Sequence, residues 1–253
     1  MSTPITLPGI DELRARIWRL EGAAARRRLV LPFGIKAIDR HLPGGGLALG
    51  ALHEVAGGSH GAINGAAAAL FVAGVAARTR GKVLWCITRP DLFAPALAQA
   101  GLVPDRVIYV EAGDEKAVLA CFEESLRHGG LAAVVAEVAR LSMTASRRLQ
   151  LAAESSGTIG LAIRRWRRPA EAADFGQPTA FVTRWRVSAL PSAQLPVPGV
   201  GRARWQLELI RCRAGESADF EVEACDAKGR LALPSNLAHG PGQKEIGRRR
   251  AAG

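Results

Sequence analysis

The sequence lacks any uninterrupted apolar run of the roughly 18 residues that a membrane-spanning helix requires. Residues 2–9, STPITLPG, also lack the basic and then apolar segments of an export signal. These two absences predict a cytoplasmic protein without a membrane segment.

Cysteine and histidine are scarce, and their spacing argues against two kinds of site. The four cysteines lie far apart without a C-x-x-C pair, and the five histidines have no metal-ligand spacing. We expect the cysteines to be buried thiols of a reducing compartment rather than disulfides or metal ligands. They are Cys86, Cys121, Cys212 and Cys225.

Acidic residues are outnumbered, since 23 Asp and Glu stand against 34 Lys and Arg, and the formal net charge is +11. Such a charge favours anionic partners, and nucleic acid first, through phosphate contacts that do not depend on sequence. The composition is also that of a GC-rich genome, in which arginine often occupies ordinary surface positions. Charge alone therefore leaves DNA binding open.

The chain is long enough, and at 48% hydrophobic residues apolar enough, to bury a sizeable core. From residue 52 onward, apolar strand patterns alternate with helix patterns. Near-continuous apolar strands of this kind predict an α/β fold, with a mainly parallel sheet and helices on both faces. The expected strands are 52–57, 82–88, 107–112, 132–138 and 159–166, and the expected helices are 63–79, 91–101, 114–130 and 144–157.

Beyond residue 180 the pattern changes to a partial two-residue alternation, as in Trp205, Leu207 and Leu209 between polar neighbours. This alternation predicts an antiparallel strand meander that continues one edge of the sheet. A turn is expected at 227–229, and the Pro- and Gly-rich residues 190–201 are expected to form a surface loop. The meander strands are expected at 181–190, 204–213, 219–226 and 229–233.

Three parts of the chain are predicted from these patterns. Residues 1–30 hold a helix at 11–22 and a connector, and residues 31–235 form one core domain. Residues 236–253 are expected to be a basic, disordered tail.

The stretch EVAGGSHGAINGA, residues 54–66, has the layout of a phosphate-binding loop. A working loop of this type needs a lysine for the β- and γ-phosphates and a hydroxyl group for Mg²⁺. Neither group stands where it is needed, whichever glycine starts the motif. We therefore interpret the stretch as a degenerate loop, and we expect no cofactor. Its residues are Gly57, Gly58, Ser59, His60, Gly61, Ala62, Ile63 and Asn64.

The run FGIKAIDRHLPGGGLALGALHEVAGG, residues 33–58, resembles the entry to RecA-type cores, and the strands that follow match the order of such a core. The later runs RWRVSALPSAQLPVPGVGRARWQLELIRCR and VEACDAKGRLALP resemble the ImuA family more narrowly. ImuA proteins are RecA-like accessory proteins of the bacterial inducible-mutagenesis cassette. The resemblance covers roughly residues 10–235 and implies a RecA-like core.

Two further departures from RecA proteins concern the catalytic carboxylates. Thr88, Arg89 and Pro90 stand where RecA proteins carry an acidic pair with the glutamate that activates water. Ala136 stands where the aspartate linked to Mg²⁺ is expected, and strand alternation turns Glu137 to the other side. An alignment shifted by one residue would make Glu137 a metal carboxylate. Because four functional groups are missing together, we predict no meaningful ATPase activity.

The segment after strand 159–166 corresponds to a DNA-contacting loop of RecA proteins, although it is shorter than a recombinase needs. Arginines interleaved with tryptophan suit phosphate contact together with base stacking. Alternation along the strands could instead bury the tryptophans and leave the arginines in solvent. The candidate DNA contacts are Arg164, Arg165, Trp166, Arg167, Arg168, Arg184 and Arg186.

The resemblance implies a non-catalytic scaffold of SOS-induced, error-prone translesion DNA synthesis (the mutasome), located in the cytoplasm at the nucleoid. The implied partners are a Y-family-like polymerase-related protein of the same cassette and an error-prone replicative-type DNA polymerase, with RecA and DNA as further candidates. Residues 11–22 and 204–253 are candidate contact segments. Two alternatives stay open: a weak ATPase or DNA-dependent NTPase completed by a neighbouring subunit, and a SulA-like cell-division inhibitor.

Overall fold

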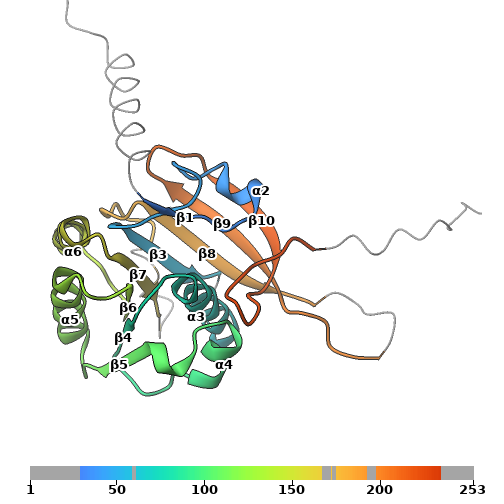
Figure 1. Cartoon of the computed structure of the whole chain (residues 1–253), viewed down its shortest axis with the longest axis horizontal. Helices are drawn as coiled ribbons and strands as arrows, with labels where there is room; N and C mark the ends of the chain where they lie inside the picture. The colour runs from blue at the N-terminus through green and yellow to red at the C-terminus, as the bar shows by residue number, and fades with distance from the viewer. Residues whose placement is uncertain (1–28, 59–60, 167–171, 173–174, 193–197, 235–253) are drawn as a thin grey trace, which may run out of the picture.

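The computed structural model of the chain describes residues 29–58, 61–166, 172, 175–192 and 198–234 (Figure 1). The helix expected at 11–22 and the tail expected at 236–253 lie outside the described residues. An eight-stranded sheet organises the described part, with the spatial order β10-β9-β8-β3-β7-β6-β4-β5. A two-stranded sheet of β1 (Val30–Leu31) and β2 (Leu47–Ala48) precedes it in the chain.

Five neighbouring strands of the large sheet run parallel to one another. Four of the five lie between other strands and beneath helices, which explains their near-continuous apolar sequences. The predicted parallel sheet is therefore confirmed. These strands are β3 (Leu52–Gly57), β4 (Val83–Ile87), β5 (Val107–Glu111), β6 (Ala133–Val138) and β7 (Ile159–Arg164).

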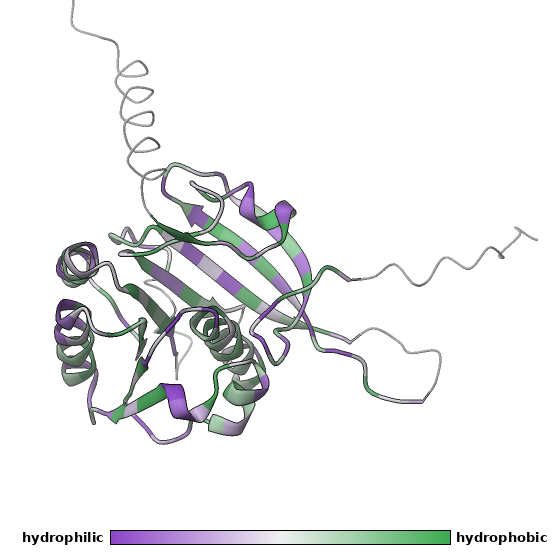
Figure 2. Cartoon of the chain, viewed as in Figure 1, coloured by the Kyte–Doolittle hydropathy of each residue, from purple (hydrophilic) through white to green (hydrophobic). Residues whose placement is uncertain are grey.

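The predicted antiparallel continuation is also confirmed. β8 (Thr183–Leu190) lies parallel to β3, and β9 (Arg204–Cys212) and β10 (Ala218–Glu223) follow it as antiparallel neighbours. Their apolar and polar residues alternate along each strand (Figure 2). The apolar residues face the core below α3, and the polar residues form a sheet face that no described helix covers.

The prediction of a strand at 229–233 is wrong, because this segment forms only an isolated bridge between Ala232 and Glu223. The Asp226 carboxylate accepts hydrogen bonds from the backbone N–H groups of Lys228 and Arg230, at 2.8 and 2.9 Å. These bonds hold residues 226–230 in a tight turn that overlaps the start of the expected strand. The turn predicted at 227–229 is present.

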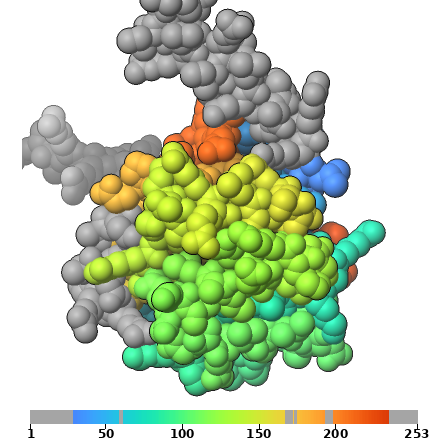
Figure 3. Space-filling view, turned by 90° about the vertical axis from the view of Figure 1, so that its left-hand side faces the viewer, coloured from blue at the N-terminus to red at the C-terminus, as the bar shows by residue number. Residues whose placement is uncertain are grey.

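Helices cover both faces of the parallel strands, as predicted (Figure 1). α3 and α4 pack on one face, and α5 and α6 lie side by side on the other, where Figure 3 shows them in green and yellow. No helix in the described part of the chain is long and apolar enough to cross a membrane. The helices are α2 (Lys36–Asp39), α3 (Ala62–Ala77), α4 (Ala94–Gln99), α5 (Glu115–His128) and α6 (Met143–Ser156), with a 3₁₀ turn at Pro104–Arg106.

Local capping signals explain the ends of α5 and α6. The side chain of Asp114 accepts a hydrogen bond from the backbone N–H of Ala117 at the start of α5, and Ser142 does the same for α6. Both helices end at a glycine in the left-handed conformation, Gly129 with φ 69° and Gly157 with φ 75°.

α3 is apolar around most of its circumference because it is covered on two sides. One side packs against β8 and β3, and the turn after β10 closes over the other. A Cβ atom at Gly74 would lie only 2.2 Å from the Cys225 sulfur. A helix buried in this way needs no amphipathic pattern, which explains its run of small residues.

The four cysteines are free thiols, but only Cys86 is fully buried. The other three are half-buried, so the prediction of buried thiols is fully confirmed for Cys86 alone. Burial raises the pKa of the Cys225 thiol to about 12 and that of Cys212 to about 11. Both thiols therefore stay protonated at neutral pH and are poor nucleophiles.

Candidate functional site

The degenerate loop connects β3 to α3 at the carboxyl edge of the parallel strands. Gly57 ends β3, Gly61 precedes α3, and residues 62–64 form the first turn of the helix. Ser59 and His60 lie outside the described residues. Ligands of open α/β sheets bind at this edge, so the loop occupies the place of a nucleotide site.

Two glycines of the loop are required by close packing. A Cβ atom at Gly57 would lie 2.9 Å from the backbone carbon of Asn64, and one at Gly58 would lie 1.8 Å from the hydroxyl oxygen of Ser188. The N–H of Gly58 donates to the carbonyl of Val187 at 2.9 Å. This amide is therefore used in the sheet, where a phosphate loop would direct it at a ligand.

The lysine and hydroxyl positions of the phosphate-loop motif carry side chains that cannot hold a triphosphate. Ile63 occupies the place of the phosphate-binding lysine when the motif starts at Gly57, and its side chain is 74% exposed. Asn64 occupies the place of the Mg²⁺-binding hydroxyl, and its Oδ1 accepts a hydrogen bond from the backbone N–H of Ala189 at 2.9 Å. Asn64 thus ties the start of α3 to the end of β8.

Replacing Asn64 with alanine is expected to lower the free energy of unfolding by about 1 kcal/mol, because Ala189 loses its hydrogen-bond acceptor. Urea denaturation followed by circular dichroism measures the change. Asn64→Asp is the matched control, since a carboxylate keeps the acceptor and suits a helix N-terminus. An equal loss in both variants would show that this hydrogen bond is not what stabilises the connection.

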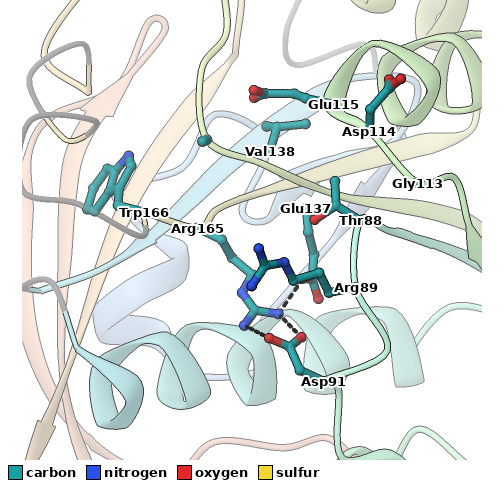
Figure 4. Close-up of a pocket in the computed structure, with 11 residues that line it drawn as sticks. Thr88, Arg89, Asp91, Gly113, Asp114, Glu115, Glu137, Val138, Arg165 and Trp166 are labelled. Atoms are coloured by element: carbon teal, nitrogen blue, oxygen red, sulfur yellow. Dashed lines mark hydrogen bonds and ion pairs between the residues drawn. The ribbon is translucent and has the colours of Figure 1, made fainter.

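An acidic cavity of about 350 Å³ lies next to the loop, at the carboxyl ends of β4, β6 and β7 (Figure 4). Four carboxylates and two guanidinium groups line it. We use the name acidic cavity for this space below. Its charged residues are Arg89, Asp91, Asp114, Glu115, Glu137 and Arg165.

The buried Glu137 and the partly exposed Arg165 form one wall of the acidic cavity. One oxygen of Glu137 accepts a hydrogen bond from the indole N–H of Trp85 at 3.0 Å. The other oxygen accepts one from Arg165 at 2.6 Å (Figure 4). Arg165 also holds both oxygens of Asp91, at 2.8 and 3.0 Å. These hydrogen bonds lower the pKa of Asp91, so its carboxyl group is ionised at neutral pH.

Each oxygen of Glu137 already has a donor, so the carboxylate acts as an anchor for Arg165 and Trp85. Ala136 packs on the opposite face of β6, in the core beneath α5 and α6, as alternation predicted. Among the described residues, no group of three or more His, Cys, Asp or Glu side chains could hold a metal ion. Glu137 lies on the α3 side of β6, with Val135 and Trp85, so it is the carboxylate that β6 presents on the side of the degenerate loop, and both of its oxygens already accept hydrogen bonds.

Two of the predicted DNA contacts, Arg164 and Arg184, are buried on either side of Glu54. The Nε of Arg184 lies 2.7 Å from one oxygen of Glu54, and the Nε of Arg164 lies 3.6 Å from the other. Arg184 also donates to the carbonyl of Gln177 and the hydroxyl of Thr179. The two arginine side chains are only 1% and 5% exposed, so they offer no surface to DNA phosphates, and the prediction is corrected for them.

The other predicted contacts do not form one patch. Arg165 is 39% exposed but bound to two carboxylates, and Arg186 is 37% exposed and paired with Glu208 at 3.2 Å. Trp166 packs edge-on against Phe175, with ring centres 5.2 Å apart. Arg167 and Arg168 lie outside the described residues. DNA contact by the remaining residues stays a prediction.

Sequence reasoning missed Glu54 and the partners of Glu137. Glu54 interrupts the apolar strand LHEVAG, and a carboxylate in a buried strand needs a cationic partner. That signal could have identified Glu54. No comparable signal exists for Trp85, whose indole meets Glu137 only through the pairing of β4 with β6.

Comparison with known proteins gives results that agree with this geometry. No protein-family model matches the chain. Among solved structures, the crystal structure of the RadB recombinase shares the fold with a TM-score of 0.56 and 18% identity, over 81% of this chain and 100% of that chain. At this identity the likeness shows the RecA-like fold alone.

Protein ImuA from two strains of Caulobacter vibrioides is a much nearer relative in sequence. Each is 41% identical to this chain over 234 residues, which cover 87% of this chain and 95% of the relative. The shared part therefore includes most of the parallel core and the antiparallel strands together. On this identity, over most of both lengths, the chain belongs to the ImuA family.

Proposed function

We propose that the chain is a RecA-like accessory protein of SOS-induced, error-prone translesion DNA synthesis, and that it acts there as a non-catalytic scaffold. Membership of the ImuA family supports the role in mutagenesis. The non-catalytic part rests on one observation: Ile63 and Asn64 occupy the lysine and hydroxyl positions of a phosphate loop, and Asn64 is bonded to β8.

Phosphoryl transfer requires charge neutralisation at the phosphates and a carboxylate that positions the metal or the water. The structure has an apolar side chain at the lysine position and Arg89 two residues after β4, and both oxygens of Glu137 on β6 already accept hydrogen bonds. The neighbouring acidic cavity carries more carboxylates than guanidinium groups, which repels a triphosphate. These features support assembly as the function.

The partners of the proposed scaffold are a Y-family-like polymerase-related protein of the same cassette and an error-prone replicative-type polymerase. RecA and DNA are further candidates. The net charge of +11 supports attraction to DNA and hence a location at the nucleoid.

Calorimetric titration with Mg²⁺-ATP tests the non-catalytic part, with a RecA protein as the positive control. We expect no heat of binding at micromolar nucleotide, because the loop lacks both the cation and the hydroxyl group. Repeating the titration with single-stranded DNA present covers the alternative of a weak DNA-dependent NTPase. Micromolar binding that depends on Mg²⁺ in either titration would contradict the proposal.

Damage-induced mutation frequency tests the cellular role. Deletion of the gene should lower this frequency after ultraviolet irradiation, and the wild-type chain should restore it. Asn64→Asp should restore it equally, because a carboxylate at this place opposes triphosphate binding but keeps the bond to Ala189. Loss of function in Asn64→Asp with normal folding would indicate that the loop still binds nucleotide.

A further inference from the structure

An apolar groove lies between α3 and α4, directly beside the degenerate loop, with a volume of about 590 Å³. Small residues on α3 form one wall and larger apolar residues at α4 form the other. The residues that matter here are Ala62, Gly65 and Ala66 on the first wall and Leu92, Phe93 and Leu97 on the second. A concave site lined in this way is the usual form of a binding pocket.

One large apolar side chain of the groove lining stands exposed, and a second exposed apolar side chain lies on the same side of α3. Phe93 lines the groove and is 69% exposed. Ile63 is 74% exposed and lies one helical turn before Ala66, so it stands on the same side of α3. Exposed apolar groups gathered beside a groove are typical of surfaces that bind another molecule.

The acidic cavity adjoins the apolar groove, and the two share Asp91, Arg165 and Trp166 as lining residues. Four carboxylates against two guanidinium groups give the cavity lining a formal charge of −2. The whole chain carries +11, so the cavity is a local region of the opposite sign. This local charge disfavours phosphate and favours a cationic group.

We propose that the apolar groove and the acidic cavity together dock a segment of another protein that carries a bulky apolar side chain and, within a few residues, a lysine or arginine. The apolar side chain enters the groove between α3 and α4, and the cationic group meets the carboxylates of Asp114 and Glu115. This inference rests on the proposed scaffold role, for which it supplies a partner surface.

A second copy of this chain is disfavoured as the occupant because two molecules of charge +11 repel each other. The chain's own residues 11–22 combine apolar and basic residues and are the competing occupant. The experiment therefore includes a full-length variant in which the basic residues of that segment are reversed in charge. The substitutions are Arg14→Glu, Arg16→Glu and Arg19→Glu.

The test is selection of a phage-displayed random dodecapeptide library on the full-length protein, followed by fluorescence anisotropy with the enriched peptides. We expect enriched peptides to combine a bulky apolar residue with a nearby lysine or arginine. Ala66→Glu should lower their affinity by about tenfold or more, because its side chain fills the apolar groove. Asp114→Asn should lower it by about threefold, since asparagine keeps the cap of α5 but removes the charge.

Two exposed residues outside both spaces supply matched controls. Leu151→Glu removes an exposed apolar side chain on α6, and Glu111→Gln removes a carboxylate at the end of β5. Neither should change peptide affinity. Enrichment of acidic peptides, or equal binding to wild type and Ala66→Glu, would overturn the proposal. Tighter peptide binding by the charge-reversed variant would also overturn it, by identifying residues 11–22 as the occupant.

Failure of the docking proposal is distinguishable from failure of the proposed function. The ATP titration and the mutation frequency of Asn64→Asp report on the loop and do not depend on peptide binding. If Ala66→Glu loses peptide binding but supports normal induced mutagenesis, the groove has no role in recruitment, and that outcome overturns the docking proposal alone.

Discussion

Replacing Glu54 with glutamine is expected to lower the free energy of unfolding by about 3–5 kcal/mol. Glu54 is fully buried on β3, and its carboxylate lies between the guanidinium groups of Arg184 on β8 and Arg164 on β7. Glutamine keeps the size of the side chain and removes its charge. Two cationic side chains would then remain in the protein interior without the anion that balances them, which is the costly half of breaking a buried ion pair.

Glu208→Gln is the matched control for this change. Glu208 also pairs with an arginine of β8, Arg186 at 3.2 Å, but both side chains are about one-third exposed, at 29% and 37%. Solvent screens such a pair, so the expected loss is below about 1 kcal/mol. Urea denaturation of both variants should give different midpoints with the same slope. Equal small losses would show that water reaches the buried cluster.

The parallel core could be predicted because its signals are local and strong. Strands such as VLWCI are apolar on both faces, and helices such as α5 begin at a capping aspartate and end at a glycine. The short α4 shows where such reasoning loses precision. This helix was predicted to begin at residue 91 but begins at Ala94. No side-chain cap precedes it, and Pro95 lies in its first turn.

The ion pairs of the candidate site could not be predicted, because their partners are distant in the sequence. Arg184 meets Glu54 across 130 positions, and the contact exists only because β8 lies parallel to β3. The sequence showed Arg184, Trp185 and Arg186 as a basic and aromatic strand. β8 lies between β3 and β9 inside the sheet, so Trp185 is buried below α3 and Arg184 is covered by Phe175 and Thr179.

The degenerate loop could be recognised from the residues it lacks, but the reason for its glycines required the structure. A glycine-rich turn is usually explained by backbone amides that approach a phosphate. Here Gly57 and Gly58 are needed because α3 and β8 approach the backbone of the loop itself. The two explanations predict different effects of a methyl group added at Gly58. If packing requires the glycine, the methyl group lowers the free energy of unfolding; if a phosphate requires it, the methyl group lowers nucleotide affinity.

Replacing Gly58 with alanine is expected to lower the free energy of unfolding by about 1–3 kcal/mol, the usual cost of an overpacked contact. The new Cβ atom would lie 1.8 Å from the hydroxyl oxygen of Ser188 and 2.8 Å from its Cβ, so rotation of the hydroxyl cannot relieve the clash. Gly65→Ala is the control, and it should change stability in the opposite direction. No atom lies within 4 Å of its added Cβ, and alanine in place of glycine in a helix should raise the free energy of unfolding by about 0.5–1 kcal/mol.

A double-mutant cycle with Ser188→Gly separates packing from ligand binding at Gly58. Ser188→Gly removes the two nearest atoms and leaves the Ser188 Cα position 3.3 Å from the new methyl group. If packing is what requires glycine, Gly58→Ala should cost much less stability in the Ser188→Gly background than in the wild type. If a phosphate requires glycine, the cost should be the same in both backgrounds and should appear in nucleotide affinity. Because the Gly58 amide already donates to Val187, we expect the first result.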